Sequence, residues 1–180
     1  MPKPQPAESY PTHDVHTTEQ VGVGLDPYDT AEKAAIFSVH YNDMGLLPIF
    51  VVITNNGDEP VALSEMHAEM VTADRTKLTP SSADDIYRRI SHPHPHTSNY
   101  PLPFPTKKTS GGVNVKTMTE IQNAQFDARA VEPHSTQAGF LFFDVSGIAN
   151  PLSGSHLYLT GVRDAKGDEL MYFEVPLGKN

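Results

Sequence analysis

The chain has 180 residues and a formal net charge of −9, with 38% apolar residues and 16 prolines. This length fits one domain, and the composition indicates a modest core with long irregular segments. The acidic excess of 22 residues over 13 basic ones predicts no nucleic-acid partner and disfavours anionic membranes. Because cysteine is absent, disulfides and cysteine-ligated metals are excluded, and no cofactor is expected.

Residues 1–19 hold four prolines and few apolar side chains, which predicts an irregular N-terminal arm before a domain over 20–180. His13 and His16 would chelate a metal on a helix, but Pro11 argues against one, so a coil is expected. The first residues carry no hydrophobic signal, and no stretch reaches the ~20 apolar residues of a membrane span. Two locations stay open: the cytoplasm, and the periplasm, envelope or exterior after loss of a signal segment.

Short strands are expected to follow the arm. Residues 21–25 alternate apolar side chains with glycine, and 36–41 also predict a strand. The strongest strand signal is 46–54, which is rich in β-branched and aromatic residues and runs into Asn-Asn-Gly at 55–57. Asn-Gly favours a tight turn with positive φ angles. Pro48 predicts an edge or a bulge near the start of this strand.

The remaining strand signals flank an insertion. Residues 66–71 are expected to pair with 77–79 through a polar turn. After the insertion the expected strands are 126–131, 139–145 and a closing hairpin of 156–162 with 169–175. About seven to nine short strands with regular turns predict an all-β fold, a two-sheet antiparallel immunoglobulin-like sandwich.

The insertion covers residues 80–125 and combines short helices with a proline-rich loop. A first helix is expected where serine precedes Asp84 and Asp85, because serine caps helices and the dipole favours acidic groups there. A second helix is expected near 116–124. Five prolines from Pro93 to Pro105 exclude a helix or a central strand between them.

The order of these elements resembles a known family. The residues that carry the resemblance are Pro-Ile-Phe-Val-Val-Ile-Thr-Asn-Asn-Gly-Asp-Glu-Pro-Val from Pro48, then Ala73-Asp74-Arg75, Val131-Glu132-Pro133, the strand 139–145 and the closing hairpin. This pattern, over residues 35–79 and 126–176, resembles immunoglobulin-like sandwich modules of unknown function in bacterial lipoproteins and secreted proteins. Their fold is similar to that of the mycobacterial immunoprotective extracellular antigen. The resemblance implies an envelope or extracellular setting and transfers no active-site residues.

The first candidate site is a set of three histidines, His92, His94 and His96, in the proline-rich loop. In a flat strand they would share one face, whereas in a polyproline helix they would diverge. Zinc, copper or nickel would recruit two of them and a third ligand from elsewhere. The alternative is a solvated loop that binds metal adventitiously.

A second candidate is a partner-binding segment with Tyr100, Leu102 and Phe104 between prolines. A preformed extended segment loses little entropy on docking, so this pattern is typical of peptide ligands. The alternative is a loop that folds back over an edge of its own sandwich.

Other reactive side chains favour structural roles. Met66 and Met70 fall on the strand face opposite His67, which indicates core methionines rather than a copper site. The acidic pairs 58–59, 84–85 and 168–169 are expected in turns and helix caps, and Arg88-Arg89 on a solvated face. The nucleophile-elbow, zinc-protease and nucleotide-binding motifs are absent from the sequence.

These observations predict a non-enzymatic protein-interaction or structural module of the bacterial envelope or exterior. Its partner would be another protein or a neighbouring subunit, as for an accessory subunit of a larger assembly. A metal-handling protein that uses His92, His94 and His96 is the alternative. A third hypothesis, an enzyme with an unrecognised site, predicts a deep pocket with convergent polar groups and perturbed pKa values.

Overall fold

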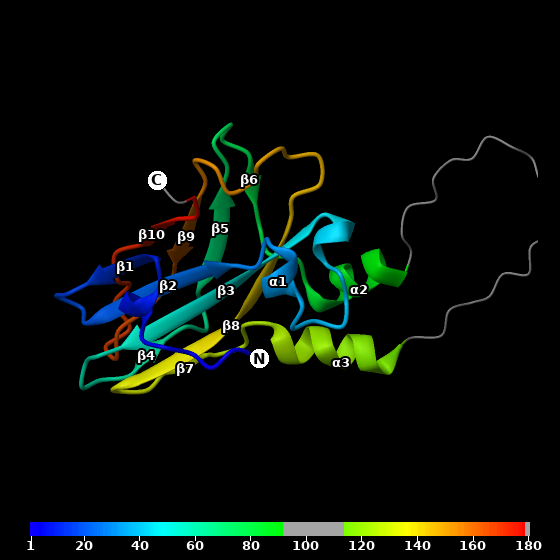
Figure 1. The fold of residues 1–180 in the computed structure, drawn as a ribbon. Helices are drawn as coiled ribbons and strands as arrows, with labels where there is room; N and C mark the ends of the chain where they lie inside the picture. The colour runs from blue at the N-terminus through cyan, green and yellow to red at the C-terminus, as the bar shows by residue number, and fades with distance from the viewer. Residues whose placement is uncertain (92–113, 179–180) are drawn as a thin grey trace, which may run out of the picture.

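In the computed structural model, which describes residues 1–91 and 114–178, most of the regular structure is β and lies in antiparallel sheets (Figure 1). The strands are β1 Thr12–His16, β2 Val21–Pro27, β3 Leu46–Asn55, β4 Val61–Ala62, β5 His67–Val71, β6 Lys77–Leu78, β7 Ala130–Val131, β8 Ser135–Asp144, β9 His156–Thr160 and β10 Phe173–Pro176. The helical segments are η1 Ala7–Ser9, α1 Ala31–Ala34, η2 Asn42–Met44, α2 Ala83–Ser91 and α3 Val115–Ala124.

Two four-stranded sheets form the body of the molecule. The first has the strand order β1-β2-β3-β8, the second has the order β10-β9-β5-β6, and β4 pairs with β7 in a small separate ladder. Apolar side chains from both sheets make one core cluster, which includes Val51 and Ile53 of β3 with Leu157 and Phe173 of the second sheet. The antiparallel β prediction is therefore confirmed as two sheets that pack face to face.

The central strand β3 is buried over its full length of ten residues. Ile49, Val51 and Ile53 face the second sheet, while Phe50 and Val52 belong to a separate cluster on the opposite face. Successive side chains of a strand point to opposite faces, so both faces of this strand must be covered. This explains why its sequence is apolar at nearly every position instead of alternating.

A layer of helices and aromatic rings covers the outer face of the first sheet. Phe140 lies at its centre, with ring centroids 4.9 Å from both Tyr28 and Phe37. Ile86 of α2 and Ile121 of α3 are fully buried against this cluster. Both helices expected between residues 80 and 125 exist, and they form part of the layer that completes the core.

The prediction of a strand at residues 36–41 is wrong. This segment forms turns and bends after α1, because its aromatic residues pack as caps over the first sheet. Glu120 of α3 fixes its path by accepting hydrogen bonds from the Ser38 backbone N–H at 3.0 Å and from Tyr41 Oη at 3.3 Å. Burial, together with the nearby Glu120 carboxylate, raises the pKa of Tyr41 far above its usual value, so this phenol stays protonated.

The predicted arm also differs from the structure, because β1 pairs along its whole length with β2. Ala7 is fully buried, and its N–H donates to Thr54 Oγ1 at 2.9 Å. A Cβ on Gly24 would approach the Ala7 carbonyl oxygen to 2.6 Å. The glycines of β2 thus make room for the start of the chain, a long-range reason that strand periodicity does not reveal.

The turn after β3 is organised by the buried side chain of Asn55 rather than by positive φ angles. Asn55 Nδ2 donates to the carbonyl groups of Glu59 and Val131 at 2.7 and 3.1 Å, and Oδ1 accepts from Gly57 N–H at 2.9 Å. Neither residue of the Asn-Gly pair is among the described residues with positive φ. β3 therefore pairs with β2 and β8, while β4 turns away to pair with β7.

Pro48 lies in a central strand and not at the edge or bulge that was expected. Pairing of β2 with β3 ends at Pro27 opposite Ile49, one residue away. The Pro48 carbonyl accepts from Tyr28 N–H at 2.9 Å, where β2 leaves the sheet. The missing N–H of Pro48 therefore falls where the pairing between β2 and β3 already ends.

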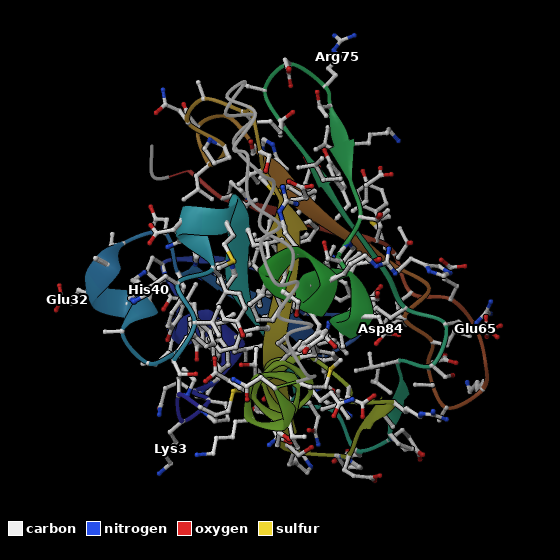
Figure 2. All side chains as sticks on the ribbon, turned by 90° about the vertical axis from the view of Figure 1, so that its right-hand side faces the viewer. Lys3, Glu32, His40, Glu65, Arg75 and Asp84 are labelled. Atoms are coloured by element: carbon white, nitrogen blue, oxygen red, sulfur yellow. The ribbon has the colours of Figure 1, made fainter. Side chains whose placement is uncertain are left out.

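Charged side chains remain at the surface of this body. Seen from the side of α2 and α3, Lys3, Glu32, Glu65 and Arg75 project outward from the periphery (Figure 2). None of the described helices is long and apolar enough to cross a membrane.

Truncation of Phe140 tests the outer layer. We expect Phe140→Ala to lower the free energy of unfolding by about 3–5 kcal/mol, because it leaves a cavity among four rings. Urea unfolding followed by circular dichroism measures this change. The control Ile36→Ala removes a side chain that is 51% exposed and should change stability by less than about 0.5 kcal/mol. Equal losses in both variants would contradict the outer-layer packing.

Candidate functional site

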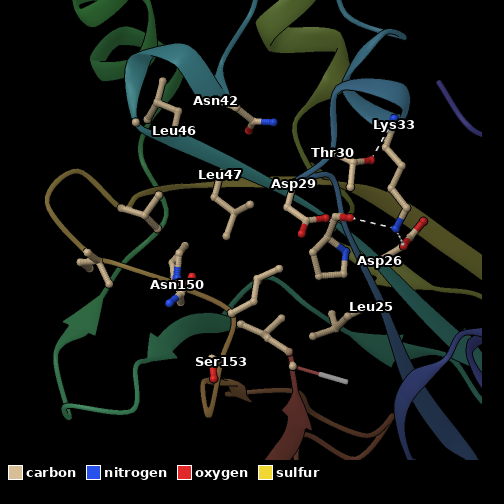
Figure 3. A pocket seen from close by; sticks show the side chains of 18 of the residues that line it. Leu25, Asp26, Asp29, Thr30, Lys33, Asn42, Leu46, Leu47, Asn150 and Ser153 are labelled. Atoms are coloured by element: carbon tan, nitrogen blue, oxygen red, sulfur yellow. Dashed lines mark hydrogen bonds and ion pairs between the residues drawn. The ribbon is translucent and has the colours of Figure 1, made fainter. Parts of the chain in front are cut away.

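A cleft with a volume of about 1040 Å³ opens at one end of the sandwich (Figure 3). Its walls come from the end of β2, the start of β3, α1, the η2 turn and the segment that follows β8. We call it the end cleft. Its volume lies just above the range of about 300–1,000 Å³ that is typical of ligand-binding sites.

The base of the end cleft is apolar. Leu25 and Leu47 line it and are also members of the core between the sheets, with almost no exposed surface. Leu152, from the segment after β8, packs against the same core and is only partly buried. Because Leu25 and Leu47 expose almost nothing, the apolar surface that a ligand would meet comes from the partly buried side chains of Val145, Ile148 and Leu152.

One wall carries three carboxylates, Asp26, Asp29 and Asp43, against the single ammonium of Lys33. Lys33 Nζ donates to Asp26 Oδ1 at 2.5 Å and to the Pro27 carbonyl at 3.0 Å. This pair is neutral as a unit and joins α1 to β2, as the dashed lines in Figure 3 indicate. Asp29 and Asp43 remain exposed, which leaves the wall acidic.

The opposite wall mixes polar and apolar groups, and none of its described residues is charged. Asn150 and Ser153 lie across the cleft from Asp29 in Figure 3. Asn150 has a φ of 51°, a left-handed conformation that asparagine tolerates better than most residues. Amide and hydroxyl groups at such positions supply both donors and acceptors, which suits a polypeptide or another polar ligand.

The segment that forms this wall is anchored at its start. Asp144 Oδ1 accepts from Ser146 N–H at 3.0 Å, and Arg89 of α2 pairs with the same carboxylate and donates to Ser146 Oγ at 2.5 Å. Val145 N–H donates to the Gly45 carbonyl at 2.9 Å. Partial burial raises the pKa of the Asp144 carboxyl, but Arg89 and Ser146 lower it more, so the net pKa lies below its usual value.

Several sequence candidates fall outside the described residues. These are the metal candidates His92, His94 and His96 and the partner-binding candidates Tyr100, Leu102 and Phe104. In the part of the chain that the structure describes, no three histidine, aspartate or glutamate residues are arranged to hold a metal ion.

The remaining candidates have clear positions. Met70 is fully buried, Met66 packs against the core and His67 is exposed, which confirms the separation of methionine from histidine. Arg89 is mostly buried in its ion pair, so the expected solvated Arg88-Arg89 face holds only for Arg88. His16 lies in β1, where its ring stacks on Phe173 at 4.1 Å, and not in a coil.

Sequence reasoning did not find the end cleft. Its polar residues come from three separated segments, around positions 26–33, 42–45 and 146–153, and no spacing rule links them. The available signal was only that Asp, Asn, Ser and Gly cluster in the connections after strands, where binding residues often lie.

Comparisons of the chain with family models, curated proteins and solved structures found no match. The class that the coordinates define is an antiparallel two-sheet β protein with a helical layer on one sheet.

Loss of the Asp144 carboxylate should make stability less dependent on pH. Because the folded-state pKa is depressed, its contribution is present above about pH 4 and is lost as the pH falls through the folded value. Asp144→Asn should cost less than about 1 kcal/mol at pH 7, since the carboxylate is half exposed. Urea unfolding at several pH values from neutral to acidic measures the difference in unfolding free energy between the wild type and Asp144→Asn. This difference should shrink below about pH 4. Asp127→Asn, an exposed site with no described salt bridge, is the control. A difference constant with pH would count against this assignment.

Proposed function

We propose that this protein is a non-enzymatic interaction module that binds a segment of a partner protein in the end cleft. The observation that carries the proposal is the combination of an apolar base with an acidic and a polar wall. An apolar centre with a polar rim is the usual anatomy of a protein-binding surface. The partner would be a separate protein or a neighbouring subunit of a larger assembly.

Charge favours a basic partner segment. Asp29 and Asp43 are exposed at the mouth, and Lys33, the one basic side chain among the described residues of the lining, is already paired with Asp26. The whole chain carries a formal charge of −9, so its field would attract a basic segment from a distance. Such complementarity raises association rates and selects partners more than it adds affinity.

The wider classification is also a proposal. The chain passes from the first sheet to the second between β3 and β5 and again between β8 and β9, which suits an immunoglobulin-like sandwich. The resemblance to bacterial envelope and secreted modules supports a location in the periplasm, on the envelope or outside the cell. The helical layer would then be an elaboration that covers the outer face of the first sheet.

Charge reversal in the end cleft tests the binding proposal. The tagged protein should retain a stoichiometric partner from its source cells, detected by native mass spectrometry. Asp29→Lys combined with Asp43→Lys should weaken retention at least about tenfold, because two attractive carboxylates become repulsive. Both positions are exposed, so a thermal melt should stay close to that of the wild type.

The matched control is Asp127→Lys with Asp168→Lys, which changes the net charge equally at exposed positions outside the cleft. This variant should retain the partner as the wild type does. Equal loss in both variants would show that only net charge matters. A wild-type protein that stays monomeric without any stoichiometric partner would contradict the proposal altogether.

A further inference from the structure

Another, shallow pocket of about 360 Å³ lies where the edge strands β1 and β10 meet. We call it the seam cavity; its polar lining includes Asp14 and His16 of β1, His156 of β9 and Glu174 of β10, with Tyr172 beside them. It borders the end cleft along these strands, since Thr12 and Leu177 line the cleft, and His13 and Pro176 line the cavity.

Two carboxylates line the seam cavity, and in each of them one oxygen accepts a hydrogen bond from the protein. Asp14 Oδ2 accepts from the Glu174 backbone N–H at 3.0 Å and lies 3.3 Å from His16 Nε2. Glu174 Oε1 accepts from Tyr158 Oη at 2.7 Å and lies 4.0 Å from His156 Nε2. The second oxygen of each carboxylate has no hydrogen bond to a described residue, so both acceptors are positioned in advance for a ligand.

His16 holds the first of these carboxylates in place. Its ring stacks on Phe173 at a centroid distance of 4.1 Å and an interplanar angle of 14°, which fixes the direction of Nε2 toward Asp14. Its Nδ1 is the one buried side-chain polar atom among the described residues without a partner. Among the described residues, the ring therefore contacts Asp14 through Nε2 alone, at 3.3 Å.

The charge of the cavity is uncompensated. None of the described residues that line it is a lysine or arginine, so with histidine counted as neutral its two carboxylates give a local charge of −2. The next carboxylate across the same sheet, Glu69, differs because Lys77 Nζ lies 2.9 Å from it. The fold thus pairs one surface carboxylate with a lysine and leaves the two at the seam without one.

Aromatic rings stand beside these carboxylates. Tyr172 is 51% exposed, and its ring centroid lies 6.1 Å from that of Tyr158. Tyr158 also donates its hydroxyl hydrogen to Glu174, and this hydrogen bond raises the pKa of Tyr158 above its usual value. An aromatic face beside a carboxylate attracts organic cations through both the ring quadrupole and the ionic charge.

We propose that the seam cavity binds an alkylammonium or guanidinium group, such as that of a lysine or arginine side chain. Asp14 and Glu174 accept its hydrogen bonds, and the exposed ring of Tyr172 packs against its stem. The cation comes either from a basic segment of a partner or from a free amine, and the chemistry at the site is the same for both. The proposal does not depend on partner binding in the end cleft.

The experiment is a set of NMR titrations of the full chain with short glycine-serine peptides that carry one lysine or one arginine. All peptides are acetylated at the N-terminus and amidated at the C-terminus, and the matched peptides carry norleucine or citrulline at the same position and therefore lack a positive charge. The amide signals of Asp14, Phe173 and Glu174 should shift with the charged peptides and stay constant with the neutral ones. Putrescine is titrated separately: a peptide that binds more tightly than putrescine identifies a partner side chain as the source, and the reverse identifies a free amine.

Asp14→Asn combined with Glu174→Gln removes both charges and keeps oxygen acceptors for the Glu174 N–H and the Tyr158 hydroxyl. It should weaken binding at least about tenfold, which corresponds to the loss of a charged contact of about 1.4 kcal/mol. Glu69→Gln, on the same sheet, should bind as the wild type does. Asp29→Asn with Asp43→Asn should also bind normally, which separates this site from the end cleft.

Three results would overturn the proposal. The first is equal shifts with the charged and neutral peptides. The second is an affinity of the Asp14→Asn/Glu174→Gln variant equal to that of the wild type. The third is that no amine binds at concentrations up to about 10 mM, since a dissociation constant above that value is too weak for a useful site. Thermal melts of all variants show whether a lost affinity reflects a lost fold. If the double variant melts early, the single variant Tyr172→Ala, at an exposed position, provides the second test and should weaken binding several-fold.

Discussion

The whole structure depends on burying both faces of β3. Ten consecutive buried residues need two covers, and the chain supplies a second sheet on one face and a layer of helices and aromatic rings on the other. The helical cover is too small to form a stable unit alone, because isolated short helices are marginal in water. Burial of this strand therefore makes the residues between β2 and β3, together with helices α2 and α3, part of the core.

Local patterns predicted the parts of the fold whose reasons are local. The strands near 46–54, 139–145 and 156–162 follow from runs of β-branched and aromatic residues, and the capping signal before Asp84 located α2. The errors have long-range causes. Residues 36–41 carry a strand-like pattern, but their rings serve the outer aromatic layer. The N-terminal segment becomes a strand by pairing with β2, whose glycines leave space for Ala7 before that strand, and pattern reading cannot detect such pairing.

The same limit applies to the two cavities. Asp29, Asp43 and Asn150 are ordinary turn residues in sequence, and only the meeting of three connections gives them a common wall. Likewise Asp14 and Glu174 are 160 positions apart and are joined by a hydrogen bond between two sheet edges. In contrast, two clusters stand out in the sequence only because their members are close along the chain. These are the histidines at 92–96 and the aromatic residues at 100–104. Sequence proximity reveals a motif, whereas a folded site depends on which edges meet.

The seam between β1 and β10 connects fold and function most directly. These strands are the ends of two sheets, and an unprotected strand edge invites pairing with other chains. Here side chains close the seam: Asp14 accepts the Glu174 N–H, and His16 covers Phe173. Carboxylates suit this position because they occupy an edge N–H and repel other acidic copies of the chain. A carboxylate that caps an edge with one oxygen keeps the other free, so the device that protects the edge also creates an acceptor for a cation.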